Sequence, residues 1–334
     1  MPSHPILSII MPCKPILLKS LFFLLTGVLG MACKKNQTEE PFSRENTLAR
    51  LGKGLEMQAE TRILPEASAD VWFVFNSGCL LNVENLELVN ASGAVMPKPY
   101  AISVLPVFRT GEMIRQQSTT MGPSGMFISG GGFSIRFESG GLPCKPNTEN
   151  GAFQFYLPAN SPSARAQNFQ VWNPIFLSAS AEPKVPFWVP AFDKELNKQR
   201  ISSSDFFNGK WYQSVFIQDS GSFSLGLKYP DSGQKTEVQV KVPEKFGLEN
   251  SICYAIFPNL NAAVRLYGFD ATSNMFHSAG YGLPASTACT FICIGLIGEN
   301  WYWGSTPGST SNTGASLEMQ MRTREAILES LTVL

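Results

Sequence analysis

The segment GMFISGGGFSIRFESGGLPCKP, residues 125–146, contains the clearest strand pattern of the chain. On both sides of a glycine run, apolar residues occupy every second position, namely Met126, Ile128, Phe133, Ile135 and Phe137. Such alternation is typical of β-strands that bury one face. Gly130–Gly132 tolerate positive φ angles, so we expect a tight turn there and a β-hairpin around it.

Composition extends this prediction to the whole chain of 334 residues, which is long enough for two ordinary domains. The 24 Phe, 28 Gly and 23 Pro indicate short strands joined by many turns. We therefore expect a mainly β protein, with two antiparallel β-sandwich domains in tandem and a short C-terminal helix. The formal net charge of +0 provides no basic field for nucleic acid, so no nucleic-acid partner is expected.

Residues 1–32 have the pattern of an export signal. Lys14 and Lys19 precede an uncharged apolar run, Ser20–Met31, which is too short for a permanent membrane span. The sequence Leu-Gly-Met-Ala-Cys that ends at Cys33 is similar to the lipobox of bacterial lipoproteins, whose cysteine is lipidated and becomes the mature N-terminus. Two alternatives stay open: translation starts at Met1 or at Met11, and the chain is lipid-anchored or is exported in soluble form.

The remaining chain divides by composition. We expect a polar tether over residues 33–57, a first β-sandwich domain over 58–158 and a proline-rich connection over 159–209. A second β domain is expected over 210–334. At its end, Thr323 provides a helix-capping hydroxyl, and Ile327, Leu328 and Leu331 share one helical face.

Five cysteines follow the predicted signal: Cys79, Cys144, Cys253, Cys289 and Cys293. In an oxidising compartment Cys79 and Cys144 could form a disulfide, and buried free thiols are the alternative. Cys289 and Cys293 are too far apart along one strand to pair, but either could reach Cys253 on a neighbouring strand. The sequence leaves the pattern open.

Catalytic patterns are weak. His277 is the only histidine after the signal, so a triad would need it, and a site with several histidine ligands for zinc is excluded by count. Ser124 lacks the frame of a nucleophile elbow, and no Lys-Ser/Thr pair follows Gly130–Gly132 as in a phosphate loop. We predict no catalytic residue, no metal site, no cofactor and no enzymatic activity, with a hydrolase that depends on His277 as the opposing hypothesis.

Aromatic residues suggest one binding site. Trp301 and Trp303 should project to the same face of a strand, while Tyr302 points to the other. Exposed, the two indoles could stack on sugar rings, whereas packing in a core is the alternative role.

The chain resembles a group of two-domain lipoproteins of Bacteroidota. The resemblance covers most of residues 58–330 and rests on Thr110–Ile114, Ser118–Thr120, Gly125–Gly131, Cys253–Phe257, Phe276, Gly282–Pro284, Ile294–Leu296 and Trp301–Trp303. The first half also looks like a ZU5-type β-sandwich, which implies an interaction domain.

Taken together, these patterns predict a lipoprotein of the outer membrane, on its periplasmic or cell-surface face. The expected role is structural or binding. The expected partners are the membrane, through a lipid on Cys33, and another envelope protein or a polysaccharide.

Overall fold

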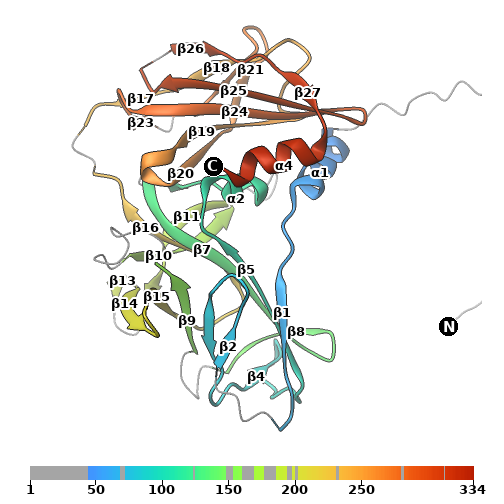
Figure 1. Cartoon of the computed structure of the whole chain (residues 1–334), viewed down its shortest axis with the longest axis vertical. Helices are drawn as coiled ribbons and strands as arrows, with labels where there is room; N and C mark the ends of the chain where they lie inside the picture. The colour runs from blue at the N-terminus through green and yellow to red at the C-terminus, as the bar shows by residue number, and fades with distance from the viewer. Residues whose placement is uncertain are drawn as a thin grey trace, which may run out of the picture. The chain divides into compact units, whose positions relative to one another are not determined.

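The computed structural model describes residues 44–67, 72–122, 125–147, 153–159, 169–176, 186–193, 198–199, 202–230, 233–279, 282–311 and 313–334. Cys33, the predicted signal at 1–32 and Ser124 lie outside these residues. Residues 42–334 belong to one compact unit. The fold is mainly β, with several antiparallel sheets and a short C-terminal helix, as the sequence predicts (Figure 1).

The first core lies between two antiparallel sheets. One sheet has the order β1(Glu60–Leu64)-β5(Tyr100–Val107)-β7(Gly125–Ser139)-β16(Gly221–Lys228)-β10(Gln170–Phe176)-β11(Pro186–Pro190), extended by β4(Leu88–Val89), β6(Met121–Gly122) and β8(Leu142–Pro146). The other sheet has the order β14(Ser203–Phe207)-β15(Lys210–Ile217)-β9(Phe153–Pro158)-β3(Leu80–Asn82)-β2(Trp72–Val74). Alternate residues of both sheets, such as Ile135 and Phe155, fill the space between them.

The second core lies against the sheet β20(Ala262–Leu266)-β19(Ser251–Phe257)-β24(Ala288–Ile297)-β25(Asn300–Ser309)-β27(Gln320–Arg322). Its facing sheet has the order β21(Gly268–Asp270)-β22(Met275–His277)-β18(Gln239–Lys241)-β26(Thr313–Ser316). Two short pairs complete the described strands: β17(Lys235–Thr236) with β23(Leu283–Pro284), and β12(Phe192–Asp193) with β13(Lys198–Gln199).

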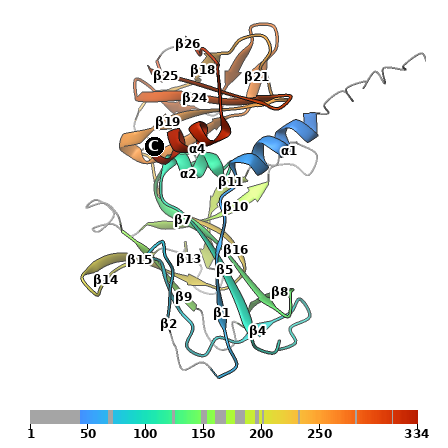
Figure 2. The ribbon, with the colours of Figure 1, turned by 45° about the vertical axis from the view of Figure 1, so that its right-hand side comes forward.

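Three helices cover the other face of this second large sheet. They are α1(Arg44–Leu55), α2(Thr110–Arg115) and α4(Arg324–Thr332), and both ribbon views show them on the same side of β19 and β24 (Figures 1 and 2). Strand β19 is consequently buried on both faces, which explains its unbroken apolar sequence SICYAIF. We call the layer formed by the three helices and this sheet face the helical layer.

The predicted C-terminal helix is confirmed. Thr323 caps it, since its hydroxyl oxygen accepts a hydrogen bond of 3.2 Å from the Ala326 N–H. Ile327 and Leu331 are buried in the helical layer.

Two other helices differ from the sequence prediction. Residues 44–55, expected to be part of the polar tether, form α1, because Leu48, Leu51 and Leu55 share one face and are buried. Thr110–Arg115, expected in a β-rich region, form α2. Glu112 accepts hydrogen bonds from the backbone N–H groups of Phe108 and Arg109, which stabilises the start of that helix.

The glycine run at 130–132 makes a β-bulge instead of the predicted turn. β7 continues as one strand from Gly125 to Ser139, and its pairing with β16 shifts register at Leu225/Gly226. Gly131 has a φ of 109°, which a residue with a side chain adopts only with strain. The hairpin prediction was wrong because a glycine run is compatible with a bulge as well as with a turn. The strand that pairs with β7 across the bulge is β16, which lies much later in the sequence.

The strands of residues 159–228 also differ from prediction. The proline-rich connection contains β10 to β14 as strands. Pro186 and Pro190 are the first and last residues of β11, at the edge of the sheet, where a missing N–H is tolerated. β15 and β16, which were expected in the second domain, pair with β9 and β7 and contribute to the first core. The sheet that each strand joins is set by pairing with residues far away in the sequence, and local sequence patterns carry no information about that pairing.

Candidate functional site

Trp301 and Trp303 lie in the helical layer. They share a face of β25, and Tyr302 points to the opposite core, where its ring meets Phe246 at 5.2 Å. Trp303 is only 7% exposed. The Trp301 ring packs so closely on α1 that a Cβ added to Gly54 would lie 2.4 Å from it. The flat exposed pair that sugar stacking requires is therefore not formed, and packing is the role that the contacts support.

One edge of Trp303 still borders a polar groove of about 380 Å³. The groove lies along β25 and β27, and its other lining residues are Ser305, Thr306, Ser316, Glu318, Gln320 and Arg322. The groove offers hydrogen-bonding groups and both signs of charge, but only one partly accessible aromatic edge.

His277 lies at the end of β22 and contacts one acidic residue. Its Nδ1 atom lies 3.0 Å from the Glu237 carboxylate and also 3.2 Å from the Ala279 N–H. With a proton on Nδ1 the ring donates to Glu237, and without it Nδ1 accepts from the Ala279 N–H. Any one tautomer therefore makes only one of the two hydrogen bonds. The ring packs over Gly268, where a Cβ would lie 2.0 Å from it. These contacts give His277 a structural setting.

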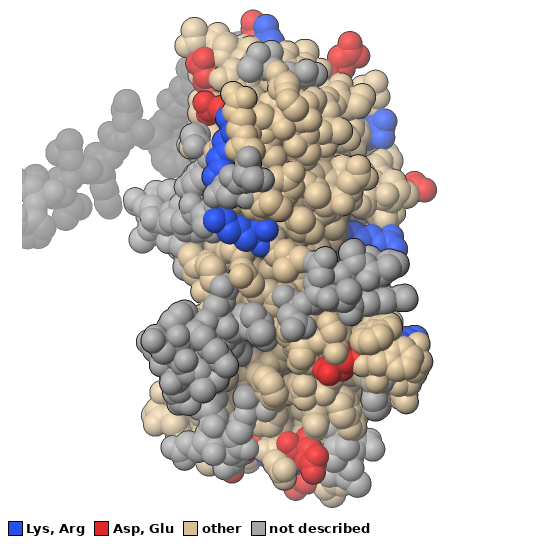
Figure 3. Space-filling view, turned by 90° about the vertical axis from the view of Figure 1, so that its left-hand side faces the viewer, with Lys and Arg blue, Asp and Glu red and all other residues tan. Residues whose placement is uncertain are grey.

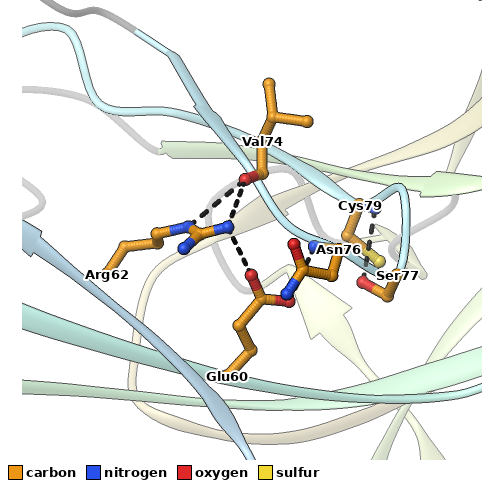
Figure 4. A network of polar contacts seen from close by, with 6 residues as sticks. All are labelled: Glu60, Arg62, Val74, Asn76, Ser77 and Cys79. Atoms are coloured by element: carbon orange, nitrogen blue, oxygen red, sulfur yellow. Dashed lines mark hydrogen bonds and ion pairs between the residues drawn. The ribbon is translucent and has the colours of Figure 1, made fainter.

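Cys79 lies in a polar network that joins β1 to the turn after β2 (Figure 4). Arg62 donates hydrogen bonds of 3.1 and 3.3 Å to the Val74 carbonyl, and the Glu60 carboxylate accepts one of 2.7 Å from the Asn76 N–H. Arg62 Nη2 and Glu60 Oε1, 2.5 Å apart, form an ion pair. The angles between the two groups do not fit a hydrogen bond. Burial raises the pKa of Cys79 to about 12, so its thiol stays protonated and unreactive at neutral pH.

The five cysteines of the described chain are buried free thiols. Cys79 and Cys144 are not joined, and Cys253 faces Cys293 directly across β19 and β24. Burial is the largest cause of a strongly raised pKa at Cys253, and it raises the pKa of Cys289 to about 11. These thiols belong to cores. Within the described residues, no group of three or more His, Cys, Asp or Glu side chains is placed to hold a metal ion.

A pocket of about 130 Å³ has a different character. It lies on the outer face of the first large sheet, where β7, β16, β10 and β11 are neighbours, and against the segment that follows α2. Seven hydroxyl side chains line it: Ser118, Thr119, Thr120, Ser129, Ser134, Ser222 and Ser224. We call it the hydroxyl pocket.

Apolar side chains form most of the remaining wall, namely Val107, Met113, Phe133, Pro174, Trp188 and Phe223. Gly132 and the amide of Gln116 complete the lining. Of the described residues that line the pocket, none is acidic or basic. On the molecular face drawn in Figure 3, charges of both signs are scattered among uncharged residues.

Several pocket hydroxyls are already used in fixing the wall. Thr119 and Thr120 donate to the Ala263 carbonyl at 3.3 and 3.2 Å, and Ser118 donates to the Met113 carbonyl at 3.3 Å. The two threonine bonds attach the segment after α2 to β20, and the serine bond ties the same segment to α2 itself. The wall is thus rigidly built.

Gln116 is the exception. Its side-chain Nε2 is buried and makes no hydrogen bond with any described residue. A buried amide N–H without a partner is uncommon in proteins and costs on the order of 1–3 kcal/mol. Local sequence patterns do not reveal this site, because its residues come from five separate stretches of chain and none forms a motif.

A scan against protein-family models, a search of curated proteins and a search of solved structures each found no match. Among the described residues, no helix is both long and apolar enough to span a membrane.

Proposed function

We propose that this protein is a lipid-anchored component of a bacterial outer membrane, with a structural or binding role and no catalytic one. The anchor would be formed at Cys33, on the basis of the lipobox-like sequence and the apolar run before it. The observation that carries the binding role is the hydroxyl pocket, whose walls combine hydrogen-bonding groups with apolar surface, as ligand sites commonly do.

The lack of charged groups in the pocket supports binding over catalysis. General acid–base chemistry needs a titratable side chain within hydrogen-bond reach of the substrate, and the described wall supplies hydroxyl and amide groups only. None of these hydroxyls is paired with a histidine, since His277 lies on β22 beside Glu237.

The anchor is tested by Cys33→Ser. We expect the variant to move from the membrane fraction to the soluble fraction of lysed cells, because the acylated thiol is lost. Cys13→Ser, which changes a cysteine inside the predicted signal, is the matched control and should stay in the membrane fraction. A Cys33→Ser protein that remains membrane-bound would refute the anchor.

A second candidate is polysaccharide binding at the groove beside Trp303, favoured by its polar lining. In that case Gln320→Ala and Arg322→Ala, which change two residues of the groove lining, should weaken polysaccharide binding. Retention of full affinity by both variants would exclude this groove.

A further inference from the structure

We propose that the hydroxyl pocket binds one ring or short chain of a neutral polyhydroxyl compound, such as a terminal sugar residue, and that Gln116 Nε2 is its principal hydrogen-bond donor. This inference rests on the proposed binding role and specifies its ligand class.

The size of the pocket limits the ligand. An apolar cavity of about 150 Å³ in another protein accommodates one benzene molecule. The hydroxyl pocket, at about 130 Å³, therefore suits a single six-membered ring or a smaller polyol. A longer glycan would have to place its remaining units outside the pocket.

The uncharged lining of the pocket excludes charged ligands. A bound carboxylate or phosphate would need a cationic or strongly donating partner, and a bound amine would need a carboxylate. No described lining residue supplies either group. The ligand that matches this wall is uncharged.

The remaining hydrogen-bonding capacity matches a compound with several hydroxyl groups. The Ser134 and Ser222 oxygens lie 2.6 Å apart, so one hydroxyl donates to the other and the second proton stays free. Thr119 Oγ1 already accepts a hydrogen bond from the Arg265 N–H, whereas the lone pairs of Thr120 Oγ1 remain available as acceptors. Gln116 Nε2 offers unused N–H donors. A ligand hydroxyl both donates and accepts, so it can satisfy both kinds of group.

Apolar wall residues would contact the C–H face of such a ring. Trp188 and Pro174 are directly opposite each other on β11 and β10, and both line the pocket. Trp188 is 6% exposed, so only a small part of its side chain can contact the ligand. Apolar surface beside hydrogen-bonding groups is a common arrangement in ligand pockets.

The first test is calorimetric titration of the purified protein with glycerol, myo-inositol, glucose and galactose, and with glucuronate and glucose 6-phosphate as charged analogues. We expect one or more neutral compounds to bind, and each charged analogue to bind at least tenfold more weakly than its neutral parent. Binding of the charged analogues alone would overturn the ligand class, and the binding role would stand.

Gln116→Met tests the donor. The side chains are similar in length, so the variant should fold, and we expect at least a tenfold loss of affinity for the neutral compound. Removing an unpartnered buried amide should also leave the melting temperature of the ligand-free protein equal or higher. A Gln116→Met protein with unchanged affinity would overturn the assignment, as would a loss of affinity on Gln320→Ala, in the groove beside Trp303, with Gln116→Met unaffected.

Two hydroxyl pairs on the same sheet supply a matched control. Ser134 meets Ser222 inside the pocket, whereas Ser103 meets Thr61 at 2.8 Å on β5 and β1, outside it. Ser134→Ala should weaken binding severalfold, and Ser103→Ala should not. If no compound of any class binds, the ligand assignment fails, and crosslinking of the anchored protein in cells decides separately whether it has a macromolecular partner.

Discussion

The helical layer and the hydroxyl pocket each contain a buried polar atom without a hydrogen-bond partner in the described chain, but the two atoms are in different surroundings. Tyr254 Oη lies between β19 and the helices, where Arg265 on the paired strand β20 is its charged neighbour. Gln116 Nε2 belongs to a residue that lines a cavity rich in hydroxyl groups. Only the second belongs to a cavity wall, so an unpartnered group indicates function where its residue lines a cavity.

The aromatic residues differ less than their sequence contexts suggest. Trp303 lies in the conspicuous sequence Trp301–Trp303 and Trp188 does not, yet the two side chains are 7% and 6% exposed and each borders one cavity. Sequence context alone therefore does not decide the role of an aromatic residue.

The largest expected effect separates stability from binding. Trp303→Ala should lower the free energy of unfolding by about 3–5 kcal/mol, because it removes a large buried side chain from the helical layer. Chemical denaturation measures this loss. Trp211→Ala, at a partly exposed indole, is the control and should cost clearly less. Equal losses in the two variants would contradict the assigned packing role of Trp303.

A smaller effect is expected where two helices of the layer touch. A Cβ added to Gly111 on α2 would lie 1.7 Å from the Leu331 carbonyl oxygen on α4, so the backbones must separate. Gly111→Ala should lower the free energy of unfolding by about 1–3 kcal/mol. Gly233→Ala provides the control, because nothing lies within 4 Å of its added Cβ. Unchanged stability of Gly111→Ala would show that α4 does not need this contact.

The smallest effect concerns Tyr254 itself. Burial, which outweighs the opposing influence of the Arg265 guanidinium, raises the pKa of Tyr254 to about 12. Below pH 10 the phenol is neutral in both the folded and unfolded states. Between pH 10 and 12 only the unfolded phenol ionises, so the folded state loses about 1.4 kcal/mol per pH unit from this group.

Tyr254→Phe should remove that part of the alkaline destabilisation, because the variant has no phenol that can ionise. Denaturation curves of the variant and the parent at pH 8, 10 and 11 measure the effect. Parallel loss of stability in the two proteins would mean that the Tyr254 hydroxyl is not sequestered as described.

The mainly β fold and the capped C-terminal helix could be predicted from the sequence, because period-two alternation and a Thr cap are local signals. The bulge at Gly131 and the partners of β15 and β16 could not, since these depend on strands that meet across long stretches of chain. Helix α1 was missed although Leu48, Leu51 and Leu55 have helical spacing, because its many charged residues resembled a tether.

Less of the candidate site was predictable. The opposite orientation of Trp301 and Tyr302 followed from strand geometry, and the burial of Trp303 in the helical layer did not. The pocket hydroxyls are ordinary serines and threonines in the sequence. They become a site only through the pairing of Ser134 with Ser222 and through the attachment of Thr119 and Thr120 to β20.

The helical layer also affects the order of folding. Arg324 donates a hydrogen bond of 2.6 Å to the Gly54 carbonyl across 270 residues, and Thr110 donates one of 2.7 Å to the Leu334 carbonyl. Contacts between such distant segments slow folding, since a long loop must close before they form. A ribosome would release most of this chain before α4 could dock on α1 and α2. The delay would keep the layer open until its last helix has been synthesised.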